Sequence, residues 1–442
     1  MKNFRFILSL LSAFFVKFKG ILVIGIFIGI IIFIFLKYLS PVLWGSSNEI
    51  IGVTGKYRPD NLPNSILNYV SYGLTRINES GDVEPSIASS WETPDNGKTW
   101  IFYLNDNAYW QDGKKITSQN LQFKFSDVAI EKPDLNTIIF KLQSPFAPFP
   151  QVVSKPVFKK GLLGNGEWKV IKIRVTGNNV EKIIISNKKR ERKTFKFYPT
   201  EERAKLAFKS GEVNKLVDIF DPKPFDSWKT VNIEKVVDLN KVVTLFFNTS
   251  PESKLTSDKS FRQALAYAIN KDEFREQRAY GPISPNSWAN NPQVKPYDYD
   301  QERALELLKS LPKELKDNAS LNLVCSPALL SQAEKIAKDW EAVGIKINLQ
   351  VVSSIPNEFE AFLALFVIPQ DPDQYSFWHS SQNTTNTSSY SNPRIDKLLE
   401  DGRTQTNKEE RKKIYMDFQR FLVEDSPAIF LYHPTSYTIV RK

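Results

Sequence analysis

The chain has 442 residues, of which 41% are hydrophobic and 24% charged, so it can bury at least one large core. Its formal net charge is +10, from 59 Lys and Arg residues against 49 Asp and Glu residues. One cysteine, Cys325, and two histidines, His379 and His433, exclude a disulfide framework and a Cys/His zinc site and disfavour a Ser-His-Asp triad. With no phosphate-binding loop and no dinucleotide fingerprint in the sequence, we expect no enzyme, no cofactor and no metal.

The first predicted element is an apolar segment over residues 20–36, GILVIGIFIGIIIFIFL, which contains no charge. At 1.5 Å per residue, a helix of this length approaches the ~30 Å of a bilayer core if Lys37 extends to the surface. Lys37 is the only basic residue close behind it, whereas four precede it: Lys2, Arg5, Lys17 and Lys19. This asymmetry predicts that residues 1–47 form a cytoplasmic N-terminus and a single-pass anchor in the cell membrane, with the bulk of the chain outside the cytoplasm.

Two alternatives to an anchor are weaker. A buried helix of a soluble domain would show a polar face, and this segment has none. A cleaved secretory signal would have a shorter apolar region and small residues of the A-x-A type, whereas this one ends SPVLWGSS. The sequence therefore favours an uncleaved signal anchor.

Strand patterns dominate the part of the chain that follows. Residues 100–104 and 137–142 are apolar and β-branched and lie between turn-rich stretches. Residues 180–185 and 194–198 flank a charged run, 188–193, which we expect at the tip of a hairpin. A nucleic-acid-binding patch is the alternative for this run, but a solvated turn explains it more simply.

Helices follow, with clear boundary signals. Thr200 is a candidate N-cap for a helix that ends near Gly211. Asp258 or Ser257 is a candidate N-cap for the next helix. Apolar residues from 414 to 422 repeat with helical spacing. In between, a strand over 321–325, a helix over 333–343 and a strand over 344–351 form a βαβ unit with a parallel sheet. The chain is therefore expected to be a mixed α/β protein with more than one lobe.

Several stretches, in this order, resemble the family 5 extracellular solute-binding proteins, the peptide, dipeptide and nickel group that delivers ligands to ABC transporters. They begin with Tyr72-Gly-Leu74 and Pro85 to Glu92, and continue through Asp95 to Leu104, Tyr109 to Lys114, Ile116 to Phe125, Gly164 to Lys169, Phe247 to Thr249, Phe261 to Asn270, Asp371 to Asp373, Tyr390 to Pro393 and Glu424 to Phe430. No single stretch is specific, but their order over residues 50–440 makes a chance match improbable.

The resemblance implies an α/β, two-lobed, periplasmic-binding-protein-like (type II) fold that encloses a ligand between hinged lobes. Lobe I would comprise residues 48–243 and 425–442, including a subdomain at about 65–148, and lobe II residues 244–424. The connection from Phe125 to Thr137 is shorter than the helical insertion usual in the family, so a reduced subdomain is expected.

The resemblance also implies ligand contacts at the lobe interface. Peptide binders of the family place an aspartate before the Asp-Pro pair, where it binds the peptide's α-ammonium, but here Ile368 stands at that position and Leu365 at the preceding tryptophan. Asp371 is a candidate substitute, although capping the turn before Pro372 is the simpler role. The predicted ligand-binding residues are Tyr69, Tyr72, Trp110, Phe366, Ile368, Gln370, Asp371, Trp378 and Tyr390. His379 is expected to be an exposed loop residue and His433 a structural one.

The sequence thus predicts a membrane-anchored solute-binding protein that captures peptides or peptide-like solutes for the permease and ATPase of an ABC importer. The alternative is a tethered sensor or adaptor that binds another protein with the same lobes. A Ser186-x-x-Lys189 spacing gives only weak support to an acyl-transfer enzyme. Nucleic-acid binding is not expected, because residues 48–442 contain 54 basic and 49 acidic residues, a net charge of only +5.

Overall fold

The computed structural model describes residues 17, 20, 25, 28–31, 48–316, 320–353, 356 and 358–442. Most of the predicted anchor, residues 20–36, therefore lies outside the described residues. Within the described part of the chain, no helix is both long enough and apolar enough to cross a membrane.

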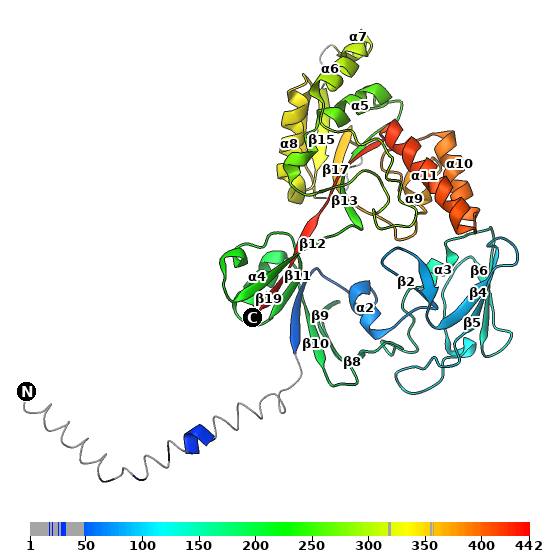
Figure 1. The fold of residues 1–442 in the computed structure, drawn as a ribbon, viewed down its shortest axis with the longest axis vertical. Helices are drawn as coiled ribbons and strands as arrows, with labels where there is room; N and C mark the ends of the chain where they lie inside the picture. The colour runs from blue at the N-terminus through cyan, green and yellow to red at the C-terminus, as the bar shows by residue number, and fades with distance from the viewer. Residues whose placement is uncertain are drawn as a thin grey trace, which may run out of the picture.

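Lobe I is built on a seven-stranded sheet with the strand order β12-β19-β11-β1-β10-β9-β8 (Figure 1). Its strands are β1 (Glu49–Thr54), β8 (Lys169–Thr176), β9 (Asn179–Ser186), β10 (Arg192–Tyr198), β11 (Lys215–Ile219), β12 (Val231–Val237) and β19 (Thr435–Arg441). Strands β9 and β10 form the predicted hairpin, with the charged run at its turn. Helix α4 (Glu201–Lys209) begins as predicted, because the Thr200 side chain accepts a hydrogen bond from the backbone N–H of Arg203.

The small subdomain contains a four-stranded antiparallel sheet with the order β4-β5-β7-β6. Its strands are β4 (Ala88–Glu92), β5 (Thr99–Leu104), β6 (Val128–Glu131) and β7 (Thr137–Leu142), and the pair β2 (Thr75–Ile77) and β3 (Val83–Pro85) lies beside it. Aromatic rings fill its core, with Phe140 in edge-to-face contact with Phe102. The short connection before β7 forms strand β6 in place of a helical insertion, and only a 3-10 turn, Ser118–Asn120, precedes it.

Lobe II is built on a six-stranded sheet with the order β14-β18-β13-β17-β15-β16. Its strands are β13 (Lys241–Phe247), β14 (Gln277–Arg278), β15 (Ser320–Cys325), β16 (Lys346–Val351), β17 (Ala361–Val367) and β18 (Ala428–His433). Its main helices are α5 (Lys259–Ala268), α6 (Gln301–Ser310), α8 (Leu330–Glu341), α10 (Pro393–Thr404) and α11 (Lys408–Asp425). Strands β15 and β16 are parallel and joined through α8, which confirms the predicted βαβ unit.

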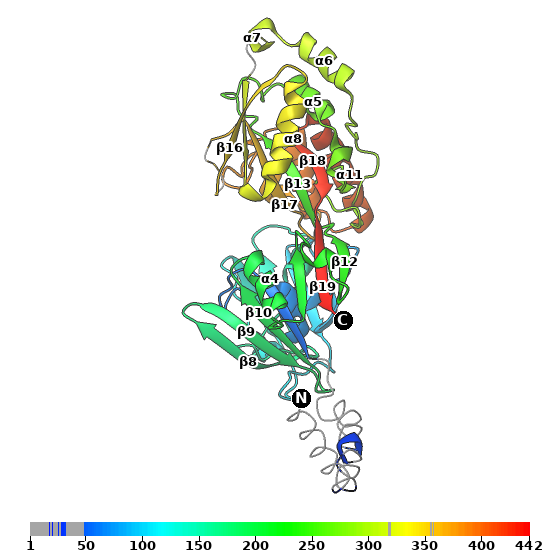
Figure 2. The same cartoon turned by 90° about the vertical axis from the view of Figure 1, so that its left-hand side faces the viewer.

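Two crossovers connect the lobes, and they lie next to each other (Figure 2). Residues 238–240 lead from β12 into β13, and Pro434 joins β18 to β19. The backbone N–H of Asp238 donates a hydrogen bond to the carbonyl of Pro434 at 3.0 Å. The expected lobe limits, 243/244 and 424/425, both fall within lobe II, close to these crossovers. The division of the chain into these two units of folding stays a prediction.

His433 lies at the second crossover with only 2% of its surface exposed. Its Nδ1 donates to the carbonyl of Lys241 at 2.9 Å, which links the two crossovers a second time. Burial lowers the pKa of His433 below its ordinary 6.5, although this hydrogen bond and the carboxylate of Asp238 act in the opposite direction. The structural role predicted for His433 agrees with this position.

We expect the free energy of unfolding to decrease as the pH falls, in part because of His433. Because its pKa is lower in the folded than in the unfolded state, its contribution is fully present above pH ~6.5 and is lost as the pH falls through the folded-state pKa, by at most about 1.4 kcal/mol per pH unit. Urea unfolding at pH 7.5, 6.5 and 5.5 should show a flatter pH dependence for His433→Gln than for the wild type. Parallel curves would contradict the prediction.

Candidate ligand-binding cleft

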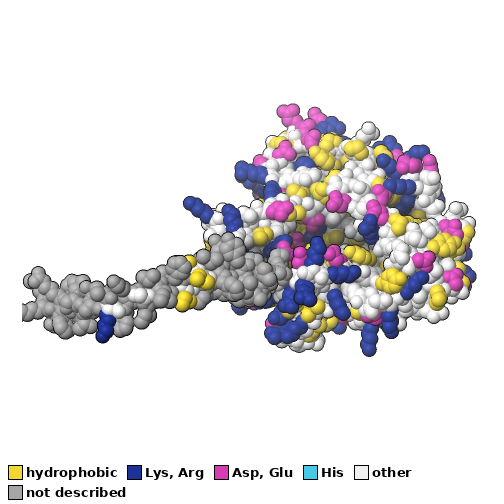
Figure 3. Space-filling view, turned by 60° about the horizontal axis from the view of Figure 1, so that its bottom comes forward, with side chains coloured by type: hydrophobic (Ala, Val, Ile, Leu, Met, Phe, Trp, Pro, Cys, Tyr) yellow, Lys and Arg dark blue, Asp and Glu magenta, His cyan; other side chains and the backbone are white. Residues whose placement is uncertain are grey.

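A cavity of about 510 Å³ lies between the lobe I side of the molecule and lobe II. Its first wall comes from α2 (Asn64–Val70), the segment after it, and α3 (Phe149–Val152) with the residues that follow. Its second wall is the loop after β17, at Pro369, Gln370, Asp371 and Asp373. The hollow between the two parts of the molecule is visible in Figure 3. A cavity with walls from both lobes is the place where a ligand would be enclosed.

The lobe II wall carries two carboxylates, and arginines neutralise both. Arg411 donates two hydrogen bonds to Asp371, Nη1 to Oδ2 at 2.9 Å and Nη2 to Oδ1 at 2.5 Å. Arg403 donates from Nε to Oδ2 of Asp373 at 3.0 Å. Burial alone would lower the pKa of Arg411, but the carboxylate of Asp371 outweighs it and raises this pKa above its ordinary value. The cleft therefore offers a ligand two carboxylates whose charge is already compensated.

The lobe I wall has a different character. Lys155 is exposed and has no ion-pair partner among the described residues that surround it. Arg76 is held by Glu84, at 2.9 Å from Nη2 to Oε2. The Oε1 atom of Gln151 is buried and has no hydrogen-bond partner in the described part of the chain. This wall combines one uncompensated positive charge with an unused acceptor.

A second cavity of about 240 Å³ adjoins the first, and Pro148, Gln151 and Asp371 line both. Three tryptophans also line it: Trp91, Trp100 and Trp288. Lys408 and Arg411 from the first turn of α11 lie over the Trp288 ring at 5.5 and 5.7 Å from its centroid. The cleft thus continues from a polar chamber into an aromatic one.

The small subdomain contacts lobe II directly along one side of the cleft. The backbone N–H of Ala147 donates to the carbonyl of Arg403 at 2.7 Å, and that of Trp288 donates to Ser80 at 3.2 Å. Lys408 forms an ion pair with Asp82. These contacts hold the subdomain against α10 and α11, so on this side the cleft is closed.

Of the nine predicted ligand contacts, three line the main cavity: Tyr72, Gln370 and Asp371. Tyr69 is exposed on α2, where it packs edge-on against Trp168. The other five are core residues with at most 5% exposure: Trp110, Phe366, Ile368, Trp378 and Tyr390. Side chains so fully covered by their own lobe present little surface to a ligand.

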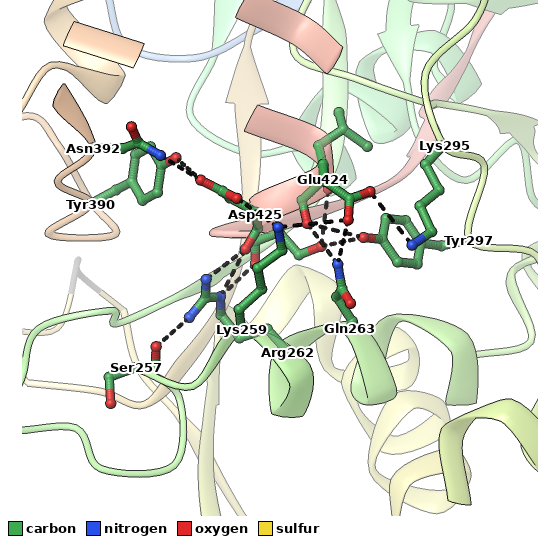
Figure 4. A network of polar contacts seen from close by, with 12 residues as sticks. Ser257, Lys259, Arg262, Gln263, Lys295, Tyr297, Tyr390, Asn392, Glu424 and Asp425 are labelled. Atoms are coloured by element: carbon green, nitrogen blue, oxygen red, sulfur yellow. Dashed lines mark hydrogen bonds and ion pairs between the residues drawn. The ribbon is translucent and has the colours of Figure 1, made fainter. Parts of the chain in front are cut away.

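Two of these core residues make contacts within the protein that account for their burial. The Trp110 indole donates to Oδ1 of Asn120 at 3.0 Å inside the subdomain, while the neighbouring Gln111 donates to three carbonyls of lobe I. The Tyr390 hydroxyl donates to Oδ2 of Asp425 at 2.6 Å, in the network shown in Figure 4. Both aromatic residues follow turns, as a ligand contact often does, but they join segments of the protein to one another.

His379 also differs from expectation, because it is only 7% exposed. Its ring stacks on Tyr375 with 4.0 Å between centroids, and its Nδ1 accepts from the backbone N–H of Ser381 at 3.1 Å. The polar loop that contains His379 folds back on α10, so a loop histidine that was expected to be exposed is buried.

The prediction missed four residues that shape the cleft: Gln151, Lys155, Arg403 and Arg411. Arg411 was detectable in principle, since an arginine at a buried position of an amphipathic helix needs an anionic partner. Gln151 and Lys155 follow Phe149-Pro150 without any local pattern that marks them.

The cleft wall leaves no room for a side chain at Gly73. A Cβ there would lie 2.3 Å from the carbonyl oxygen of Val153 and 2.5 Å from the carbonyl carbon of Ser154. We expect Gly73→Ala to lower the free energy of unfolding by about 1–3 kcal/mol through overpacking. Gly281→Ala is the control, because its Cβ would meet only Val423 Cγ2, at 3.8 Å. Urea midpoints that fall equally in both variants would contradict the prediction.

Two lobes joined by paired crossovers around a shared cavity define a class of binding proteins that enclose their ligands. Residues 82–178 and 186–389 match the family described as "Bacterial extracellular solute-binding proteins, family 5 Middle", and the chain belongs to this family. The family consists of solute-binding proteins and not of enzymes. Its sequence-based identification is confirmed.

Curated relatives and solved structures agree with this assignment. The chain is 24% identical to "Oligopeptide-binding protein AppA" of Bacillus subtilis (strain 168), over 89% of this chain and 86% of that protein. It is 24% identical to "Dipeptide-binding protein" of Escherichia coli (strain K12), over 82% and 83%. The fold is that of NikZ from Campylobacter jejuni, solved with Ni(L-His), with a TM-score of 0.72, 22% identity and coverage of 89% and 94%.

Proposed function

We propose that the chain captures a small peptide-like solute between its lobes, outside the cytoplasm, and delivers it to the permease and ATPase of an ABC importer. The observation that carries this proposal is the cavity of about 510 Å³ whose walls come from both sides of the crossovers. Relatives named as oligopeptide-binding and dipeptide-binding proteins support peptides as the solute class. The apolar segment 20–36 supports a single-pass anchor with a cytoplasmic N-terminus, which would keep the lobes within reach of the permease.

The charges in the cleft support a narrower ligand class. Asp371 and Asp373 are both paired with arginines, and Ile368 is buried where peptide binders of the family carry an aspartate. A free α-ammonium would find no uncompensated carboxylate among the described residues that line the cleft. Lys155 instead offers a positive charge. We therefore propose a ligand with a carboxylate near Lys155 and without a free ammonium group at its other end.

Thermal unfolding with defined ligand pools tests the solute class. Pools of N-acetylated and of unmodified di- to octapeptides should be compared with sugars and metal chelates. A ligand at 100 times its dissociation constant adds about 2.7 kcal/mol to the stability. A shift with acetylated peptides would support the proposal. A shift only with sugars or chelates would overturn the peptide assignment, and no shift with any solute would favour the tethered sensor or adaptor.

Lys155 provides a test of the proposed ligand polarity. We expect Lys155→Gln to weaken binding of a carboxylate-bearing peptide about fivefold, the value of an ion pair of roughly 1 kcal/mol at an exposed site. The amide of the same peptide should lose nothing. Lys160→Gln, an exposed lysine outside the cleft lining, is the matched control. Calorimetric titration in which both variants behave like the wild type would exclude Lys155 as a ligand contact.

A further inference from the structure

Positive charge is concentrated in one part of lobe I. The three consecutive strands β8, β9 and β10 and their turns, residues 169–198, contain ten Lys and Arg residues and two Glu residues, a net charge of +8. Residues 48–442 as a whole carry only +5, so the rest of the folded chain is slightly acidic. On the face shown in Figure 3, Lys and Arg side chains gather on the lower part of the molecule. The excess of positive charge is therefore local.

Five of these residues form what we call the basic end of lobe I: Lys169, Lys188, Lys189, Arg190 and Arg192. All five are exposed, and none of them forms an ion pair with another described residue. The register brings them together, since Lys169 pairs with Ser186 and Arg192 pairs with the same residue from the other side. The set thus lies at one end of the sheet, around the β9–β10 turn.

The nearby acidic groups do not neutralise the basic end. Glu191 accepts a hydrogen bond from Asn187 Nδ2 at 2.6 Å within the turn. Glu49 is engaged by Lys193 and Lys215, and the resulting ion pairs lower its pKa although burial acts in the opposite direction. Glu167 is exposed next to Lys169. One free acid against five free bases leaves a strong positive field at this end.

The same end of the sheet is where the chain enters lobe I. Strand β1 begins at Glu49, which pairs with Lys193, and runs parallel to β10. Residues 37–48 separate β1 from the apolar segment, and twelve residues span at most about 40 Å when fully extended. If residues 20–36 cross the membrane, the basic end is tethered close to the lipid surface. Lobe II, with α6 and α7 (Lys313–Lys316), lies at the opposite end of the molecule (Figure 2).

We propose that the basic end of lobe I docks on a lipid surface with anionic headgroups and fixes the orientation of lobe I on the membrane. This proposal rests on the proposed anchor. Lys and Arg residues near an anionic bilayer are attracted by its surface potential, and the tether keeps them within its range. Lobe I becomes the fixed lobe, while lobe II faces away and is the lobe that moves about the crossovers when its contacts with the subdomain open.

Labelling is simplified by the cysteine content of the chain. Cys325 is the only cysteine and is fully buried, and burial raises the pKa of its thiol. A cysteine introduced by Lys189→Cys at the basic end, or by Glu302→Cys on α6, can therefore carry a fluorescent donor selectively. The full chain would be reconstituted in vesicles of phosphatidylcholine alone, or with 30% phosphatidylglycerol, each containing a headgroup acceptor.

We expect energy transfer from position 189 to rise at least about twofold in the anionic vesicles and to return to the neutral value in 0.5 M salt. Transfer from position 302 should not change. Reversing three charges in Lys169→Glu, Lys188→Glu and Arg192→Glu should abolish the rise. The matched control reverses three exposed lysines of lobe II, Lys254→Glu, Lys338→Glu and Lys346→Glu, and should retain it.

Equal transfer from position 189 in neutral and anionic vesicles would overturn the proposal and would point to the permease as the partner of this surface. Flotation separates this result from failure of the anchor. The wild-type chain should float with neutral vesicles if residues 20–36 insert. If it does not float, the anchor proposal fails. Docking of the basic end is then tested separately, by flotation with anionic vesicles at low salt. The triple variant of the basic end should lose that flotation, and a chain that does not float with them at all would refute the docking.

Discussion

Replacing Arg411 by methionine should lower the free energy of unfolding by about 3–5 kcal/mol, because the largely covered carboxylate of Asp371 is left without its counter-charge. The side chains of Arg411 and Asp371 are only 8% and 13% exposed, and two hydrogen bonds join them. Without Arg411 the carboxylate keeps the backbone N–H of Asp373, at 2.8 Å from Oδ1, but loses its ion-pair partner. Arg411 also donates from Nε to the carbonyl of Gly402 at 2.7 Å, so the variant loosens the contact between α10 and α11 as well.

The measurement is urea unfolding of Arg411→Met, Asp371→Asn and the double variant. The double variant should lose less than the sum of the single losses, because neither partner then remains as an unpaired charge. The control is Lys413→Met, on the exposed face of the same helix. It should change the free energy of unfolding by less than about 0.5 kcal/mol, as is usual for substitutions at surface sites. Arg411→Met should also free the Asp371 carboxylate in the cleft, so tighter binding of unmodified peptides in this variant would support the proposed ligand polarity.

The second large effect is expected at Arg262, which is 4% exposed in α5. Its guanidinium donates to the carbonyls of Thr256 and Ser257 before the helix and to those of Asp425 and Ser426 at the C-terminal end of α11 (Figure 4). Methionine would fill much of the volume but leave four carbonyl groups without this donor. We expect Arg262→Met to lower the free energy of unfolding by roughly 3–5 kcal/mol.

Arg420→Met provides the matched control, because Arg420 is more than half exposed on α11, where it forms an ion pair with Asp417 and lies over the Phe421 ring. The same urea titration should give it a change of about 0.5 kcal/mol or less. Arg262→Lys distinguishes charge from geometry. An ammonium group cannot reach carbonyls on both sides at once, so Arg262→Lys should recover less than half of the loss. Full recovery would show that the positive charge alone is sufficient.

Local sequence patterns predicted the secondary structure well where the interactions that stabilise it are also local. The 321–325 and 344–351 strands with a helix between them, and the capping residues Thr200 and Asp258, are visible in the sequence because hydrogen bonds and periodicity there are local. The family followed from the order of several such stretches. None of these patterns required knowledge of distant contacts.

The cleft was harder to predict because its chemistry depends on distant pairs. Asp371 and Arg411 are forty residues apart in sequence, and only the packing of α11 brings them together. An aromatic residue next to a turn looks the same in the sequence whether it lines a cavity, as Tyr72 does, or fills a core, as Trp378 does. Gly73 and Gln151 matter because of the segments that pack against them, which the local sequence does not reveal.

The place of β19 in lobe I has a consequence for the order in which the protein can form. Among the described residues, strand β12 pairs only with β19, and β19 joins it to β11 and the rest of the sheet. Yet β19 follows every residue of lobe II in the chain. During synthesis or passage through a membrane, the sheet of lobe I therefore keeps an unpaired edge until all of lobe II and then β19 have left the ribosome or crossed the membrane. The first lobe in the sequence is thus the last to be completed.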